Sequence, residues 1–239
     1  MPQGVRVRVS LPAKKIKASL PPTSFAQTSI LNSMRFILIH GYKSSPEKNF
    51  FPWLISELRS RGHEVIAPTL PDPENPQIDA WLELLKQETR FLKNDTVIYG
   101  HSIGAAAALR FLEMSEAAST PRACVLSSPP LMVRKPESLQ AFFMSDFDFD
   151  VLMWKASEFY VIHSKDDAVV PFSHGEKYAE RLHATLIATE SDGHFDGAKY
   201  PVILDTLLKA ASPLEESEPG SKLQNDYTGI DFSANLSQE

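Results

Sequence analysis

The chain has 239 residues, of which 43% are hydrophobic, enough to form the core of a single α/β domain. Its formal charge of −6 excludes a general attraction to nucleic acid or anionic membranes. The sequence contains no run of about 18 apolar residues, so no membrane span is predicted. Cys124 is the lone cysteine, which excludes an internal disulfide and indicates an intracellular protein.

The two ends of the chain differ in composition from the middle. Residues 1–33 contain five basic residues, four prolines and no acidic residue, as in a plastid or mitochondrial transit peptide. An untargeted disordered arm, which would leave the protein in the cytoplasm, is the alternative. Residues 212–239 are acidic and poor in core-forming residues, so we expect a flexible tail there. The globular domain is therefore expected over residues 34–211.

Within this domain, short apolar runs alternate with amphipathic helical patterns. Such alternation predicts an α/β fold with a mostly parallel six-stranded sheet, helices on both faces, and ligands at the carboxyl ends of the strands. The runs typical of strands are residues 35–41, 64–67, 97–99, 122–127, 158–163 and 184–189. Helices are expected around residues 51–62, 78–92, 173–182 and 200–210, with a further helix from residue 103.

Residues 128–157 interrupt this alternation. Their prolines, the pair Phe142–Phe143 and the alternation of Asp and Phe over 146–150 predict an irregular excursion with one or two short helices. A connection of this length in a compact domain is often a lid or the wall of a binding site. The alternative is that these aromatic side chains cover the outer edge of the core.

The pattern Gly-x-Ser-x-Gly at residues 100–104 follows a predicted strand and precedes a predicted helix. In that context the pattern marks a nucleophile elbow, although the three fixed residues alone are only moderately specific. We expect Ser102 to have a strained backbone, with Gly100 and Gly104 leaving room for the turn to close. The first turn of the helix would direct the Ile103 amide at an oxyanion.

A serine nucleophile needs a histidine base, and the histidine needs a carboxylate to fix its tautomer. In hydrolases with such an elbow the acid and then the histidine follow the serine in the chain. Asp166 and Asp167 follow the fifth predicted strand, and His194 follows the sixth, directly after a glycine. We favour Asp167, which begins an Asp-x-x-Val-Pro pattern, and expect Asp166 to cap the turn or face solvent. The other six histidines are expected to pack or face solvent.

The remaining candidates concern the pocket. A second oxyanion donor, typically worth about 3 kcal/mol, is expected from the Tyr42 amide, since Gly41 allows close approach after the first strand. Tyr42 and Phe50 are candidates for the pocket wall, with core packing as the alternative for Phe50.

Cys124 lies within a predicted strand and is expected to be a core residue. The histidines show no metal-ligand spacing, so neither a metal nor a cofactor is expected.

These motifs, in this order, resemble the α/β-hydrolase superfamily over residues 34–210. Within it the chain is most similar to the small, short-capped serine hydrolases of the retinoblastoma-binding-protein-9 type, on its compact size, its alanine-rich elbow helix, the Asp-Asp pair before the proline and the Asp-Gly-His-Phe ending. The Leu-x-Cys-x-Glu peptide implied by that label is missing, so no retinoblastoma-type interaction is expected. The matching segments are residues 39–41, 100–104, 166–171 and 192–195.

The resemblance implies a carboxylesterase-like hydrolase that cleaves an ester, thioester or amide through an acyl-enzyme on Ser102. His194 would act as base and then acid, Asp167 would orient it, and the amides of Ile103 and Tyr42 would bind the oxyanion. A short cap favours an open pocket and a small or aryl ester as substrate. The sequence does not indicate an oligomeric state. Because a fold does not fix a function, a non-catalytic ligand-binding or protein-interaction module is the alternative.

Overall fold

The computed structural model describes residues 33–89, 92–116 and 120–212, and the fold below is that of the unit beginning at Met34. The arm and the tail expected at the two ends lie outside the described residues, apart from Ser33 and Ser212, and remain predictions. The elements are β1 (Arg35–Ile39), α1 (Phe51–Ser60), β2 (Glu64–Ile66), α2 (Ile78–Thr89), β3 (Thr96–His101), α3 (Ile103–Met114), β4 (Ala123–Ser127), the 3-10 helix η1 (Glu137–Phe143), α4 (Phe149–Leu152), β5 (Glu158–Ser164), α5 (Phe172–Arg181), β6 (Thr185–Thr189) and α6 (Pro201–Ala211).

The strands form one parallel six-stranded sheet, which confirms the predicted fold class. Their order is β2-β1-β3-β4-β5-β6, and every neighbouring pair is parallel. The first strand, β1, therefore lies inside the sheet, and the chain moves out to β2 and returns to β3 before it continues to β6. In sheets of this kind ligands bind at the carboxyl ends of the strands, near the point where the strand order reverses. Here the reversal lies between β1 and β3.

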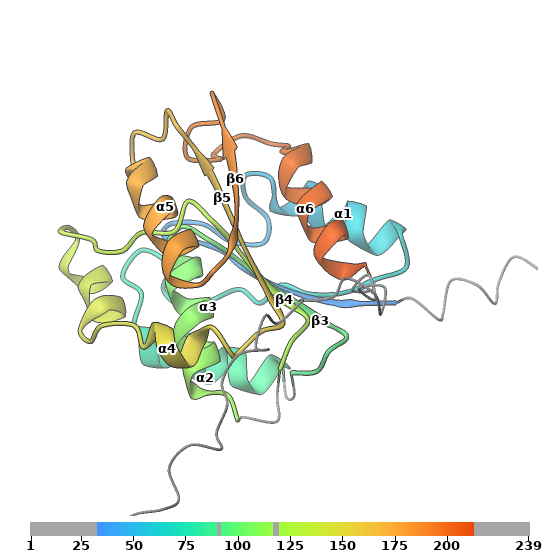
Figure 1. The fold of residues 1–239 in the computed structure, drawn as a ribbon, viewed down its shortest axis with the longest axis horizontal. Helices are drawn as coiled ribbons and strands as arrows, with labels where there is room; N and C mark the ends of the chain where they lie inside the picture. Colours follow the sequence, from blue (N-terminus) through green and yellow to red (C-terminus); the bar gives the residue numbers. More distant parts are fainter. Residues whose placement is uncertain (1–32, 90–91, 117–119, 213–239) are drawn as a thin grey trace, which may run out of the picture. The chain divides into compact units, whose positions relative to one another are not determined.

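Helices cover both faces of the sheet, because successive strand side chains point to opposite sides. Phe36 and Leu38 pack with α1 and α6, whereas Ile37 and Ile39 pack with α2, α3 and α5. Figure 1 shows this division, with α1 and α6 on one side of the strands and α2, α3 and α5 on the other. Within the described ranges, no helix is both long and apolar enough to cross a membrane.

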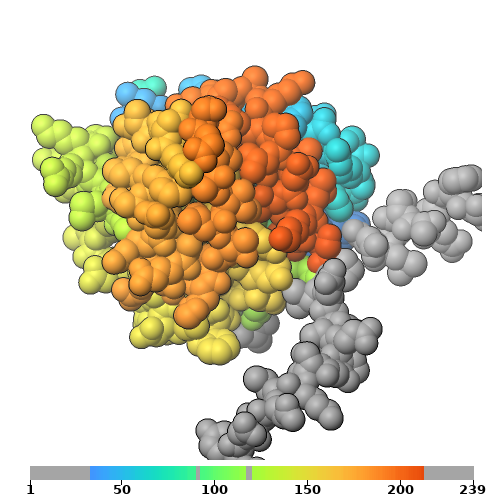
Figure 2. Space-filling view, turned by 45° about the horizontal axis from the view of Figure 1, so that its top comes forward, coloured from blue at the N-terminus to red at the C-terminus, as the bar shows by residue number. Residues whose placement is uncertain are grey.

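Residues 128–157 form the predicted irregular excursion, called the insert below, and contain η1 and α4. Phe142 is fully buried, and its ring lies edge-on to that of Trp81 at 5.3 Å between centroids. Arg110 of α3 donates hydrogen bonds to the carbonyl oxygens of Phe142 (3.1 Å) and Ser145. Some aromatic residues of the insert thus join the core, and its backbone is fastened to the outside of α3. In Figure 2 the first part of the insert is the lime-coloured projection beside the orange surface of α5.

Candidate active site

The backbone at Ser102 is strained, as expected for a nucleophile elbow. Ser102 lies between β3 and α3 with φ 55° and ψ −126°, a conformation that costs a non-glycine residue about 1–3 kcal/mol. A Cβ atom on Gly100 would lie 2.6 Å from both the Cα of Ala105 and the carbonyl oxygen of Gly104. The turn can therefore close only with glycine at position 100, and its closure holds the Ser102 side chain at the end of the sheet.

Gly104 serves a contact between elements rather than the turn itself. A Cβ atom there would lie 2.5 Å from the carbonyl oxygens of both Ile39 and His40, at the end of β1. The first turn of α3 thus packs directly on the backbone that leaves β1. A Cβ atom on Gly41 would in turn lie 3.1 Å from that of Ser102. The loop after β1 therefore touches the elbow.

The two expected oxyanion donors lie on this shared boundary. Tyr42 and Ile103 line the same cleft as Ser102. The Ile103 amide belongs to the first turn of α3, where backbone N–H groups have no acceptor within the helix. The positive end of the helix dipole adds to the field at this point. Both residues thus lie at the cleft that contains the serine.

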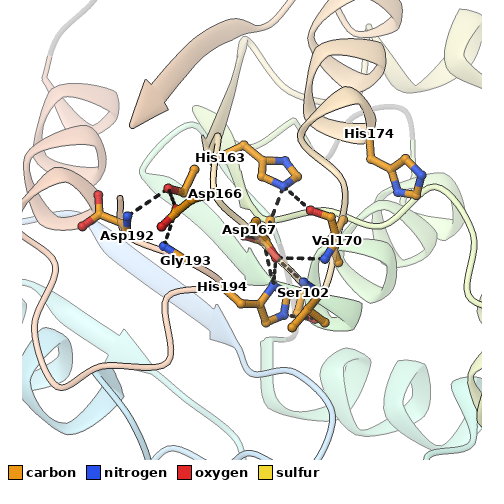
Figure 3. Close-up of polar contacts among 12 residues, drawn as sticks. Ser102, His163, Asp166, Asp167, Val170, His174, Asp192, Gly193 and His194 are labelled. Atoms are coloured by element: carbon orange, nitrogen blue, oxygen red, sulfur yellow. Dashed lines mark hydrogen bonds and ion pairs between the residues drawn. The ribbon is translucent and has the colours of Figure 1, made fainter. Parts of the chain in front are cut away.

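Three side chains from distant parts of the sequence meet at the carboxyl ends of the strands (Figure 3). Nε2 of His194 lies 2.9 Å from Oγ of Ser102, and Nδ1 of His194 lies 2.9 Å from Oδ2 of Asp167. Since an ionised carboxylate can only accept, the ring proton belongs on Nδ1, and Nε2 presents its lone pair to the serine hydroxyl. This is the tautomer in which a histidine can take a proton from serine.

Asp167 is surrounded by hydrogen-bond donors. Beyond His194, its carboxylate accepts from Oγ of Ser128 (2.7 Å) and from the amides of Val169 (2.9 Å) and Val170 (2.8 Å). Burial by itself raises the pKa of Asp167, but hydrogen bonds from His163, His194, the Val170 amide and Ser128 outweigh it and hold the pKa well below its usual range. The carboxylate is therefore ionised at any pH at which a histidine base is active.

Ser128 and His163 were not anticipated as site residues. Ser128 follows β4 with φ 44° and is fully buried, so its hydroxyl is aimed at Asp167 by a strained backbone. His163 was expected to pack or face solvent; it is buried, and its Nε2 also lies 3.4 Å from Oδ2 of Asp167. The same nitrogen lies 3.0 Å from the Val170 carbonyl oxygen, so it carries the proton. Their position at the carboxyl ends of β4 and β5 was the only available signal.

Asp166 faces solvent, as predicted, and it also fastens the loop that carries His194. Its Oδ1 accepts from the Ser164 hydroxyl (2.5 Å) and from the Gly193 amide (2.9 Å). The hydrogen bond from Ser164 is the main cause that lowers the pKa of Asp166, followed by that from Gly193. Ser164 in turn accepts from the Asp192 amide at 2.9 Å. The two neighbouring aspartates thus hold the side chain and the backbone of the histidine loop separately.

His101 was expected to pack or face solvent, yet it contacts the histidine loop from the other side. Its Nε2 lies 2.9 Å from the carbonyl oxygen of His194, so this nitrogen carries the proton and donates. Burial, with a smaller contribution from His194, lowers the pKa of His101 to about 3. The ring of Phe50 packs edge-on against it at 5.4 Å, and Phe50 is fully buried. Phe50 is therefore a core residue and not a pocket wall.

The cleft beside Ser102 has a volume of about 490 Å³, within the range of small-molecule sites. One wall comes from the insert, so this excursion lines the cleft beside Ser102 as well as covering part of the core. Tyr42 also lines the cleft, as expected, and so does His174, which the sequence did not single out. The lining residues are Tyr42, Ser102, Ile103, Pro130, Met132, Val133, Arg134, Lys135, Pro136, Leu139, Val169, Val170, Pro171, His174 and His194.

The remaining sequence-based expectations concern residues away from this cleft. Cys124 is fully buried in β4, and burial raises the pKa of its thiol, as suits a core residue. His63 lies beside β2 and accepts a hydrogen bond from the Met34 amide at 3.3 Å. Within the part of the chain that the structure describes, no group of three or more His, Cys, Asp or Glu side chains is placed to hold a metal ion.

Comparison with known proteins places this chain in a family. A sequence model of the family described as serine hydrolase matches residues 36–200. YdeN of Bacillus subtilis, named as a hydrolase, is 32% identical over 180 residues, which are 71% of this chain and 92% of YdeN. The serine hydrolase RBBP9 of Rattus norvegicus is 23% identical over 152 residues, 64% of this chain and 80% of RBBP9.

Solved structures agree with the sequence comparison. The crystal structure of the ydeN gene product from B. subtilis superimposes with a TM-score of 0.72 at 30% identity and covers 76% of this chain and 100% of its own. Est1E from Butyrivibrio proteoclasticus shares the fold at 13% identity, with a TM-score of 0.59 over 75% of this chain and 88% of Est1E. The α/β-hydrolase fold is thus established, and the chain belongs to the serine hydrolase family.

Proposed function

We propose that this protein hydrolyses carboxylic esters, thioesters or amides through an acyl-enzyme on Ser102, with esters the first class to test. The observation that supports this most directly is the position of the His194 ring. It lies 2.9 Å from Ser102 Oγ on one side and 2.9 Å from Asp167 Oδ2 on the other. A binding module has no need of a serine, a histidine and a carboxylate in this register.

In the first half of the reaction, Ser102 Oγ attacks the acyl carbon while its proton passes to Nε2 of His194. The carbonyl oxygen becomes an oxyanion, and the amides of Ile103 and Tyr42 donate hydrogen bonds to it. When this intermediate collapses, the bond to the leaving group breaks. The alcohol, thiol or amine departs with the proton that His194 returns, and the acyl group stays on Ser102.

In the second half, water takes the place of the leaving group. His194 accepts a proton from the water, whose oxygen attacks the acyl carbon of the ester on Ser102. The same amides bind the second oxyanion, and the proton on His194 passes to Ser102 Oγ as the carboxylic acid is released. Asp167 stays ionised throughout and stabilises the imidazolium each time it forms, because its pKa is held far below neutrality.

The test is intact-mass labelling with a fluorophosphonate, which phosphonylates an activated serine. The wild type should gain one adduct, whereas Ser102→Ala and His194→Ala should gain none because the first lacks the nucleophile and the second its base. Ser60→Ala, which removes an exposed hydroxyl at the end of α1, is the matched control and should label like the wild type. A folded wild type that does not label would overturn the proposal and favour the non-catalytic alternative.

If labelling depends on both residues, p-nitrophenyl esters, acyl thioesters and p-nitroanilides with the same acyl group separate the three substrate classes. The structure favours acyl groups of small size, since the cleft is about 490 Å³ and shares its space with the leaving group. We expect aryl esters to be hydrolysed fastest, because an aryloxide leaves most readily. Equal rates for all three classes would contradict that order while keeping the acyl-enzyme.

A further inference from the structure

The wall that the insert contributes to the cleft carries two positive charges. Arg134 and Lys135 line the same cleft as Ser102 and His194, and both are exposed. Among the ion pairs of the described residues, neither has a carboxylate partner. Among the described residues, carboxylates pair instead with Arg61, Arg110 and Lys165, which lie outside the cleft. Two unpaired cations therefore lie together where a substrate would bind.

The other polar side chains of the cleft complement these charges. Among the described residues that line the cleft there is no Asp or Glu. Nδ1 of His174 accepts the Leu131 amide at 3.2 Å, so Nε2 carries the ring proton and can only donate. Tyr42 adds a phenolic hydroxyl. The rest of the lining is largely apolar: Pro130, Met132, Val133, Leu139, Val169 and Val170. A carbon chain that ends in an anion fits such a lining better than a neutral or cationic chain.

The backbone that carries the two cations is fixed before any ligand arrives. The Tyr178 hydroxyl donates to the carbonyl oxygen of Pro130 at 3.0 Å, and the Gln140 side chain donates to that of Arg134 at 2.7 Å. Leu139, just beyond the cations, is buried in the core. Because the wall is held at several points, little backbone freedom is lost when an anion binds to it.

We propose, on the basis of the proposed function, that the cleft selects acyl esters that carry a second, anionic group away from the ester bond. Arg134 and Lys135 would bind this group, with the acyl chain lying on the apolar lining between them and Ser102. A carboxylate or a phosphate would meet the same chemistry, since guanidinium and ammonium groups bind both.

Three p-nitrophenyl esters with chains of equal length test this specificity: the hexanoate, the adipate half-ester and the 5-phosphonopentanoate. We expect kcat/KM for at least one anionic ester to exceed that for the hexanoate by roughly tenfold at low ionic strength, since each exposed charge pair contributes only a few-fold. The preference should shrink in about 0.5 M salt because exposed charges are screened. The anionic ester that is preferred identifies the carboxylate or the phosphate.

In the double variant Arg134→Gln with Lys135→Gln, the ratio of kcat/KM for the anionic ester to that for the hexanoate should fall to about one. The matched control is Lys86→Gln with Lys93→Gln, which removes two exposed cations outside the cleft and should leave that ratio unchanged. A ratio near one in the wild type, or a ratio that survives loss of Arg134 and Lys135, would overturn the proposal. An equal decrease of this ratio in both double variants would also overturn the proposal, since the preference for the anionic ester would then depend only on the net charge of the protein.

Binding of the same esters to Ser102→Ala separates this proposal from the proposed function. If the wild type hydrolyses none of them, but Ser102→Ala binds an anionic ester about tenfold tighter than the hexanoate, the selective cleft stands and the hydrolysis of esters fails. If the wild type hydrolyses all three equally and Ser102→Ala binds them equally, ester hydrolysis stands and the selective cleft fails.

Discussion

On the nucleophile side of the site, formed by residues 40–42 and 100–104, the position of Ser102 is fixed by backbone contacts around Gly100 and Gly104 that leave no space for a side chain there. On the acid–base side, formed by Ser128 and residues 163–171 and 190–195, the positions of Asp167 and of the loop that carries His194 are fixed by hydrogen bonds to side chains. The first arrangement depends on single residues that no other type can replace. The second is shared among several donors, so the loss of one leaves the others in place.

The largest effect should follow from replacing the carboxylate on which the acid–base side converges. In Asp167→Asn the amide can donate to Nδ1 of His194, which favours the wrong histidine tautomer. We expect kcat to fall by about 10⁴-fold. The matched control is Asp166→Asn, which changes the neighbouring carboxylate that faces solvent and should reduce kcat far less. Steady-state hydrolysis of an aryl ester measures both, and equal losses would contradict the assignment of the acid.

A glycine substitution tests the nucleophile side. In Gly104→Ala the new Cβ atom would lie 2.5 Å from two carbonyl oxygens at the end of β1, which cannot move without shifting the strand. We expect a loss of about 3 kcal/mol in the free energy of unfolding, measured in urea. Gly197→Ala is the control, because its Cβ atom would meet only the far end of the Tyr200 side chain. A small loss for Gly104→Ala would show that the elbow can relax.

His101 makes the contact between the two sides, and the dependence of the free energy of unfolding on acid pH tests its burial. Its pKa is lowered from 6.5 to about 3 by burial, so below pH 6.5 the unfolded chain binds a proton that the folded chain does not. Stability therefore falls as the pH drops below 6.5, by about 1.4 kcal/mol per pH unit, and is unaffected above it. His101→Gln removes the titrating group and keeps a donor.

Urea unfolding of the wild type and His101→Gln, measured at intervals from pH 7.5 to pH 5, gives this slope as a difference. The wild type should lose roughly 2 kcal/mol more than the variant over that range. Parallel curves would mean that His101 is protonated in the folded state. His183→Gln serves as the control, since this histidine is exposed next to α5.

The smallest effect should come from removing one donor of the shared set. Ser128→Ala deletes the hydroxyl 2.7 Å from Oδ2 of Asp167 and leaves the amides of Val169 and Val170 in place. We expect a loss of about 1.5 kcal/mol in stability and a fall of roughly tenfold in kcat. Ser173→Ala, an exposed serine at the start of α5, should change neither. A loss as large as that of Asp167→Asn would show that Asp167 depends on this one donor.

The contrast between the two sides also explains how far the sequence could be interpreted. The parallel sheet was predictable because each strand is a short apolar run between helical patterns. Ser102 was predictable because its turn is a local motif whose glycines are within two residues of it. Asp167 and His194 followed from their order in the chain and their places at strand ends.

The residues that support Asp167 and His194 could not be predicted in this way. Ser128 and Asp167 are 39 positions apart and His101 and His194 are 93 apart, so no spacing connects them. His163 and His174 look like ordinary packing or surface residues until β5 and α5 bring them to the site. Such contacts depend on how neighbouring strands align in the sheet, which propensities and periodicity do not encode.

The way in which the insert is attached has a consequence for how the enzyme can change over evolution. Arg110 binds the main-chain carbonyl oxygens of Phe142 and Ser145, and Lys155 binds that of Ser115. In the contacts with Arg110 the insert contributes only its peptide backbone, which every sequence provides, whereas Lys155 contributes its side chain. The exposed residues of the insert that face the cleft, such as Met132, Arg134 and Lys135, are therefore free to vary by single substitutions while the insert keeps its place. New substrate preferences can arise in this segment without disturbing the chemistry that is inherited with the sheet.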